Sequence, residues 1–215
     1  MQFDIITIFP EIFDSYFNES ILGRAREKNQ VSIFTHDIRK NAINNYGQVD
    51  DKPYGGGPGM LLMFEPLYQT LKKIKKKENY KVILMSAKGK KFTQEKAQDY
   101  SKLEQVIIIC GRYEGVDERI LEYIDEEISI GDYVLTGGEI PAMLITDAVT
   151  RLLPGVLGKD ESSVDESHSI DGELEYPQYT RPENIDINGK SLTVPGVLLS
   201  GDHAKIDQWQ KKHKK

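Results

Sequence analysis

The chain has 215 residues, of which 39% are hydrophobic and 29% charged, with a formal net charge of −6 at pH 7. These values fit one globular domain, or one domain with a small appendage, and exclude a uniformly basic nucleic-acid-binding protein. No apolar run could span a membrane, and the N-terminus has no signal-peptide pattern. The single cysteine excludes an internal disulfide and favours a cytoplasmic location, and the four scattered histidines show no metal-ligand spacing.

Short apolar segments alternate with helical patterns along the chain. We predict strands at Phe3–Ile8, Val31–Thr35, Val82–Met85, Val106–Cys110 and Glu126–Ile130. We predict helices at Pro10–Asn18, Ser20–Lys28, Glu65–Lys77, Thr93–Ser101, Asp117–Ile124 and Glu139–Leu153. Because the strands are continuously apolar, the sheet should be covered on both faces. The predicted fold is therefore α/β, with a mostly parallel sheet and right-handed crossovers.

Two glycine-containing loops follow predicted strands and lead into helical patterns. The first loop runs from Ile109 to Asp117 and the second from Ser129 to Glu139. Glycines at such junctions let the backbone approach a ligand, and the carboxyl ends of parallel strands share one edge of a sheet. Neither loop has a dinucleotide or nucleoside-triphosphate motif, and the loops carry several acids but one base, Arg112. They therefore predict one shared pocket for a neutral or cationic ligand.

The charges of the chain are segregated. Residues 72–91 carry nine lysines and one acid, and residues 204–215 carry five lysines and one acid. Lysine runs of this kind form either solvated helix faces and frayed tails or patches that follow a phosphate backbone. The sequence alone leaves both interpretations open.

The C-terminal third changes in composition. The predicted helix from Glu139 is apolar nearly all round, which indicates burial in a core or in a subunit interface. Residues 158–175 are acidic and serine-rich, which is typical of a linker or lid, and residues 176–215 are too few to hold much of a core. We therefore expect a domain at 1–157, a linker at 158–175 and a short C-terminal segment at 176–215.

Several blocks of the chain, taken in order, closely resemble the bacterial tRNA (guanine-N1)-methyltransferases, which are knotted SPOUT-class enzymes. The resemblance extends from Ile6 to Trp209, and its most specific blocks are Asp50–Met60, Cys110–Arg119, Ser129–Pro141, Pro154–Gly158 and Tyr176–Pro182. In Asp50–Met60 two prolines favour a shaped loop over a flexible connection. The resemblance implies a deep trefoil knot, a homodimer, S-adenosylmethionine as methyl donor, and methylation of the tRNA guanine at position 37, just after the anticodon.

The same resemblance assigns roles to individual residues. Arg151 takes the place of the catalytic arginine. The methyl donor would contact Met85, Ser86, Ala87, Gly111, Tyr113, Glu114, Gly115, Ile130, Gly131, Asp132, Tyr133, Val134, Leu135, Gly137, Gly138 and Pro141. The 1–157 domain would bind the donor and the 176–215 segment would bind tRNA. Mg²⁺ stays open as a further cofactor.

The general base of the family is usually an aspartate in the linker. An ungapped count from Gly158 places Glu166 there, with Asp165 beside it, and the count back from Tyr176 implies an insertion. Relatives usually continue well beyond Trp209, so the lysine-rich end of this chain is expected to substitute for their later tRNA contacts.

The chemistry requires few groups. Guanine N1 must lose a proton, for which a carboxylate is suited, and the charge that develops on O6 can be stabilised by a guanidinium. Read without the resemblance, Arg151 would form a surface ion pair with Asp147, four residues earlier, and Glu166 would be a solvated acid. Two other functions remain open: a catalytically silent RNA-binding module, and a methyltransferase that acts on another RNA or a small molecule.

Overall fold

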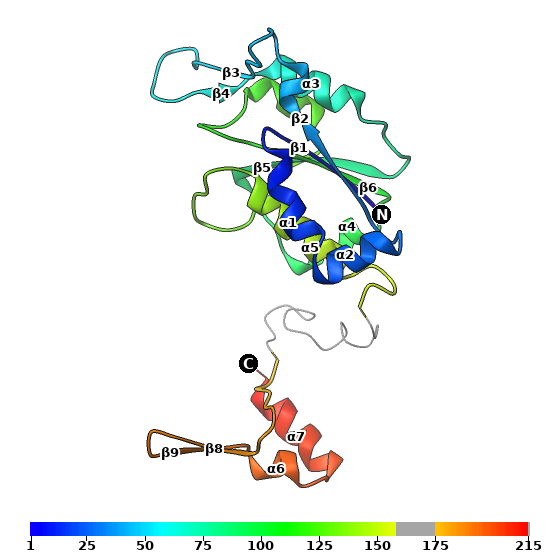
Figure 1. Ribbon diagram of the computed structural model, residues 1–215, viewed down its shortest axis with the longest axis vertical. Helices are drawn as coiled ribbons and strands as arrows, with labels where there is room; N and C mark the ends of the chain where they lie inside the picture. The colour runs from blue at the N-terminus through cyan, green and yellow to red at the C-terminus, as the bar shows by residue number, and fades with distance from the viewer. Residues whose placement is uncertain (158–174, 215) are drawn as a thin grey trace. The chain divides into compact units, whose positions relative to one another are not determined.

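The computed structural model describes residues 1–157 and 175–214 (Figure 1). The chain divides into two compact units, Met1–Gly158 and Lys159–Lys215. The strands of the first unit are β1 (Gln2–Thr7), β2 (Ser32–Asp37), β3 (Asp50–Asp51), β4 (Leu61–Leu62), β5 (Tyr80–Lys91), β6 (Gln105–Cys110) and β7 (Glu126–Ser129). Its helices are η1 (Pro10–Phe13), α1 (Asp14–Phe17), α2 (Ser20–Glu27), η2 (Ile38–Asn41), α3 (Phe64–Lys73), α4 (Gln94–Ser101), η3 (Glu118–Tyr123) and α5 (Glu139–Thr150), the η elements being 3₁₀ helices.

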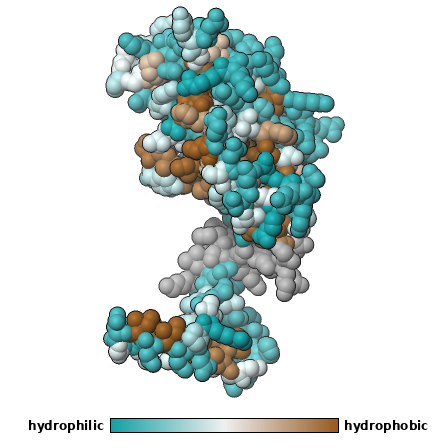
Figure 2. Space-filling view, viewed as in Figure 1, coloured by the Kyte–Doolittle hydropathy of each residue, from teal (hydrophilic) through white to brown (hydrophobic). Residues whose placement is uncertain are grey.

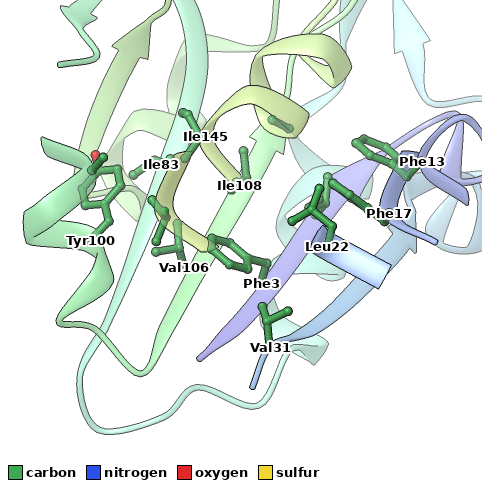
Figure 3. Packing of buried hydrophobic residues seen from close by; sticks show 14 of the residues in the cluster. Phe3, Phe13, Phe17, Leu22, Val31, Ile83, Tyr100, Val106, Ile108 and Ile145 are labelled. Carbon is green, nitrogen blue, oxygen red and sulfur yellow. The ribbon is translucent and has the colours of Figure 1, made fainter. Parts of the chain in front are cut away.

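A five-stranded parallel sheet forms the centre of the first unit, with the order β2-β1-β6-β5-β7. Successive residues of β6 enter different cores: Val106 and Ile108 pack with α1, α2, α4 and α5, whereas Ile107 and Ile109 pack with α3, η2 and η3. Figure 3 shows the first of these cores. The predicted α/β class and the burial of both sheet faces are confirmed. The arrangement is consistent with the trefoil knot that the resemblance implies.

The end of β5 differs from the prediction, which stopped this strand at Met85. The strand continues to Lys91, and both Met85 and Lys90 pair with Ile128 of β7 across an irregularity. Gly89 permits this, because a Cβ on it would lie 2.5 Å from backbone atoms of Glu127 and Ile128. No apolar pattern predicted the extension, since Ser86–Lys91 contains three lysines and no large apolar residue.

Three helices also differ from their predicted form. The helix predicted at Glu65–Lys77 is α3, which ends at Lys73, so Lys75, Lys76 and Lys77 lie beyond it. The segment predicted as one helix at Pro10–Asn18 is a 3₁₀ turn, η1, followed by the single turn α1. The segment predicted at Asp117–Ile124 is the 3₁₀ helix η3, which begins after Asp117, whose carboxylate accepts a hydrogen bond from the Arg119 N–H. Such short segments lack the length at which α-helical periodicity is decisive.

The second unit consists of a hairpin and two helices. Strands β8 (Asn184–Ile187) and β9 (Lys190–Thr193) are antiparallel, and α6 (Gly196–Leu199) and α7 (His203–His213) follow. The hairpin turns at Asn188 and Gly189, which both have positive φ values, as two-residue hairpin turns favour. None of the described residues in this unit is buried, and Figure 2 shows hydrophobic side chains on the surface of the hairpin.

Candidate functional site

A pocket of about 450 Å³ lies at the carboxyl ends of β6 and β7 and beside residues Leu84–Lys88 of β5. Both glycine-containing loops line it, together with Leu61 of β4. It also includes every residue that the resemblance assigns to the methyl donor, except Asp132. Asp132 instead forms an exposed ion pair with Lys91, with 2.5 Å between Oδ2 and Nζ. The two loops therefore form one cavity at the edge of the sheet where ligands of α/β proteins bind.

The two loops are joined directly through their backbones. The Gly138 N–H donates a hydrogen bond of 2.9 Å to the Gly111 carbonyl, and Arg112 and Gly137 form an isolated antiparallel bridge. A Cβ at Gly138 would lie 2.7 Å from the Cα of Cys110 and 3.0 Å from the Cβ of Met85. Only glycine fits at position 138 without movement of the loops, so this residue is needed for the pocket to have its observed shape.

A third segment, absent from the predicted elements, completes one wall of the pocket. The N–H groups of Leu62 and Glu114 donate to the carbonyls of Gly115 and Met60, each at 3.0 Å. The Asp117 N–H donates to the Leu62 carbonyl at 2.9 Å. The proline- and glycine-rich block Asp50–Met60 is therefore followed by a short strand, β4, which pairs with the first loop.

A buried ionic network lies beneath the junction of the loops. The Glu139 side chain is 2% exposed and accepts hydrogen bonds from the Thr7 hydroxyl at 2.9 Å and from Arg112 Nε at 3.1 Å. The Arg112 guanidinium carbon lies 4.8 Å from the centre of the Phe9 ring. A Cβ at Gly137 would lie 2.4 Å from Arg112 Nε and 2.5 Å from Glu139 Oε2. The network therefore holds the second loop and the start of α5 against the first loop.

Sequence reasoning treated Arg112 and Glu139 only as charges of the loops and missed their pairing. The two residues are 27 positions apart, and Thr7 and Glu139 are 132 positions apart, so no local pattern signals these contacts. Arg112 lines the pocket, but its charge is matched by Glu139.

The pocket lining carries an excess of acid. Its carboxylates are Glu114, Glu118 and Glu127, and its bases are Lys88 and the paired Arg112. Such a lining suits a cationic ligand better than a polyphosphate.

Cys110, under the first loop, is fully buried, and this burial raises the pKa of its thiol well above the usual value. Cys110 is therefore a packing residue, as its sequence position indicates.

Of the residues assigned to catalysis, the structure describes only Arg151, and Arg151 does not line the pocket. Arg151 is half-buried and directly follows the last residue of α5. One turn earlier, Asp147 accepts a hydrogen bond of 2.5 Å from the Tyr16 hydroxyl, and this bond raises the pKa of Tyr16 to about 12. Glu166 and Asp165, the two candidate bases, are outside the described residues.

The fold and the pocket define the class: an α/β protein with a pocket of small-molecule size between glycine-containing loops at the carboxyl edge of a parallel sheet. Over residues 1–215 the chain matches the family described as "tRNA (Guanine-1)-methyltransferase TrmD". The tRNA (guanine-N(1)-)-methyltransferase of Staphylococcus carnosus is 53% identical over 215 residues, which are 100% of this chain and 86% of that protein. Those of Staphylococcus haemolyticus and Staphylococcus aureus strain N315 are 52% identical with the same coverage. The chain belongs to the tRNA (guanine-1)-methyltransferase family.

Two features are not found in the described part of the chain. Within residues 1–157 and 175–214, no helix combines the length and apolar character that a membrane crossing needs. The same residues contain no group of three or more His, Cys, Asp or Glu side chains placed to hold a metal ion.

Proposed function

We propose that this protein transfers a methyl group from S-adenosylmethionine to N1 of the guanine at tRNA position 37. The observation that carries the proposal is the pocket in which both glycine-containing loops, joined at Gly111 and Gly138, meet under an acidic lining. Membership of the tRNA (guanine-1)-methyltransferase family defines the reaction class. The proposal places the protein in the cytoplasm, where tRNA is modified.

The residues of the pocket fit this donor. The volume of about 450 Å³ lies within the range of small-molecule sites, roughly 300–1,000 Å³. Gly111, Gly137 and Gly138 allow the backbone to contact the ligand, and Glu114 contributes negative charge for a positively charged sulfur. When bound, the donor supplies a methyl group that the sulfonium has already activated.

The protein must then prepare the guanine. We assign removal of the N1 proton to Glu166, with Asp165 as the alternative, and stabilisation of the charge on O6 to Arg151. In this scheme the 1–157 domain holds the donor, the 158–175 linker brings the base, and the 176–215 segment contacts tRNA.

The base assignment gives a first prediction. Glu166→Gln should lower the single-turnover methylation rate by about two to four orders of magnitude, because it removes general-base catalysis. Donor affinity, measured by calorimetry, should stay unchanged, since the glycine-containing loops are intact. Asp165→Asn is the matched control. A severe defect in that control alone would move the base to Asp165, and full rates in both variants would contradict a linker base.

An exposed apolar surface supports the homodimer as part of the proposal. Ile140 and Leu144 of α5 are 55% and 40% exposed, and Ile12 of η1 and Tyr16 of α1 are 41% and 42% exposed. The Tyr16–Asp147 hydrogen bond joins α1 to α5, so these residues form one surface. Figure 2 shows hydrophobic side chains gathered on this side of the first unit. A second copy of the chain would cover this surface through a two-fold, self-complementary interface.

The decisive experiment is methyl transfer to unmodified tRNA. A transcript with guanine at position 37 is incubated with labelled S-adenosylmethionine, and the product nucleoside is identified after digestion. We expect 1-methylguanosine, and no product from a transcript with adenine at that position. Label on another base or position would contradict the proposal, as would donor binding without transfer. Parallel reactions with Mg²⁺ and with EDTA measure the dependence on the metal ion.

A further inference from the structure

The segment that includes the end of α3 presents a dense group of positive charges. Lys72, Lys73, Lys75, Lys76 and Lys77 are all exposed. Within the described parts of the chain none of the five forms an ion pair with a carboxylate, whereas other lysines of the same unit, such as Lys81, Lys91 and Lys96, do so. No carboxylate of residues 1–157 and 175–214 therefore neutralises the charge of these five lysines.

A second segment adds to the same surface. The Lys73 ammonium donates to Asn41 Oδ1, and Asn41 Nδ2 donates to the Thr70 hydroxyl at 2.8 Å, so η2 lies against the end of α3. Arg39 and Lys40 of η2 are exposed. We name the combined group the α3 basic surface; it consists of Arg39, Lys40, Lys72, Lys73, Lys75, Lys76 and Lys77. Polar side chains project from this end of α3 and the loop after it (Figure 2).

Stabilisation of the helix dipole explains only part of this surface. Lys72 and Lys73 lie in the last turn of α3, where cations interact favourably with the helix C-terminus. Lys75, Lys76 and Lys77 lie beyond the helix end, where that interaction fades. The nearby acids are few: Glu78 is adjacent in sequence, and Glu104 accepts a hydrogen bond from the Asn79 N–H at 3.2 Å. The surface therefore keeps a strong positive charge on a protein whose net charge is −6.

The position of the surface limits what it can bind. The lysines immediately precede Tyr80, the first residue of β5, whereas the pocket begins at Leu84 and Met85 on the same strand. At about 3.3 Å per strand residue, the four to five residues from Tyr80 to Leu84 and Met85 place the lysine-bearing end of β5 roughly 13–17 Å from the pocket. A methyl donor or a single nucleoside cannot contact both. A polynucleotide can, and its phosphates are the anions that a field of unpaired lysines attracts.

We infer that the α3 basic surface binds the phosphate backbone of the tRNA at a distance from the target guanine. This inference rests on the proposed function, because it takes tRNA as the substrate. The lysines contact phosphates and not bases, so they add affinity for tRNA without selecting its sequence.

The test compares two triple variants that remove the same charge. The test variant carries Lys75→Gln, Lys76→Gln and Lys77→Gln, and the control carries Arg24→Gln, Lys28→Gln and Lys102→Gln, which are exposed on the other side of the sheet. Direct tRNA binding is measured by fluorescence anisotropy between 50 and 200 mM salt. The test variant should bind at least tenfold more weakly at the lowest salt, and its salt slope should be shallower by about 2, given 0.7–0.9 per lost phosphate contact. Its donor affinity and its rate at saturating tRNA should match the wild type.

Several results would overturn the inference. A tRNA affinity and salt slope equal to those of the control would do so, as would weaker binding with an unchanged slope. Because the readout is binding, a protein that binds tRNA through this surface but methylates another base would refute only the proposed function. Binding of the wild type and the test variant to anionic phospholipid vesicles is also measured. If the three substitutions weaken binding to vesicles but not to tRNA, the surface binds a membrane and the inference is wrong.

Discussion

The two glycine-containing loops can pack against each other only because Gly138 has no Cβ. Gly138 allows no side chain, since a Cβ would lie 2.7 Å from a backbone Cα, whereas a Cβ at Gly111 would have its nearest contact at 3.5 Å. Gly138→Ala should therefore cost about 1–3 kcal/mol of unfolding free energy through overpacking and should weaken donor binding at least tenfold. Urea denaturation and calorimetric titration measure the two effects.

Gly111→Ala is the matched control for stability. Its methyl group meets only ordinary van der Waals neighbours, so the free energy of unfolding should stay close to that of the wild type. Equal stability of the two variants would show that the loops can separate without cost, and that the contact at Gly138 does not shape the pocket.

The buried pair of Arg112 and Glu139 makes a second prediction at the scale of residues. Among the described residues, Arg112→Ala would leave the buried Glu139 carboxylate with only the Thr7 hydroxyl as partner, which should cost about 3–5 kcal/mol. The double variant Arg112→Ala/Glu139→Gln should recover part of this loss, because it removes the unpaired charge. Chemical denaturation of the single and double variants gives the coupling energy. The exposed pair Lys102–Asp99 is the reference, and Lys102→Ala should cost less than about 1 kcal/mol.

At the scale of elements, Glu126 joins β7 to both β5 and α4. Its carboxylate accepts hydrogen bonds from Lys81 of β5 at 3.0 Å and from Lys96 and Tyr100 of α4 at 2.5 and 2.7 Å. Burial alone would raise the pKa of Glu126, but the bonds from Lys96, Tyr100 and Lys81 outweigh it and lower the pKa to about 2. The carboxylate therefore stabilises the fold only while it is ionised.

The direction of the pH effect follows from this shift. A lowered native pKa contributes stability that is complete above the ordinary value of 4.5 and is lost as the pH falls towards 2. Denaturation between pH 7 and pH 2.5 should show this loss for the wild type. Glu126→Gln should be less stable at pH 7 and show a smaller decrease in acid. Glu95→Gln, an exposed change on α4, should keep the wild-type profile, and an unchanged profile in Glu126→Gln would refute the assignment.

A substitution on the exposed face of α5 tests the proposed dimer. Leu144→Asp places a charge at the centre of the apolar surface formed by α5, η1 and α1, so it should weaken dimerisation by at least a hundredfold. Sedimentation velocity at micromolar concentration measures the change. Leu199→Asp in α6 introduces the same charge at an exposed leucine of the other unit and should leave the dimer intact. A wild-type protein that sediments as a monomer would contradict the proposal.

The accuracy of the element predictions followed the strength of the apolar signal. The strand at Val106–Cys110 was predicted nearly to its ends, because an unbroken apolar run has few alternatives. The β4 strand could not be predicted, since its two residues become a strand only by pairing with Asp50 and Asp51 and joining the first loop. The β8–β9 hairpin carries an Asn-Gly turn signal that the sequence reasoning did not use.

For the molecule as a whole, the loops of the site could be found from sequence, but their connections could not. Glycine placement and the family resemblance identified residues of both loops that line the pocket, but they included Asp132, which does not line it, and missed Leu61 of β4. The contacts that shape it, Gly111 with Gly138 and Thr7 with Glu139, depend on the strand order β2-β1-β6-β5-β7, in which β1 lies beside β6 and β5 beside β7 although neither pair is consecutive in the sequence. No local pattern encodes that order.

The large sequence separation of the residues in these contacts has a consequence for the protein during its synthesis. Thr7 leaves the ribosome early, but its partner Glu139 is 132 residues away. At a translation rate of about 5–20 residues per second, that interval takes roughly 7 to 26 seconds. During this interval β1 has been synthesised, but the pocket cannot form, because α5 and the loop before it have not yet been synthesised. A nascent chain therefore cannot gain stability from its small-molecule ligand until the parallel sheet is nearly complete, and the unfinished sheet must be protected from aggregation by other means.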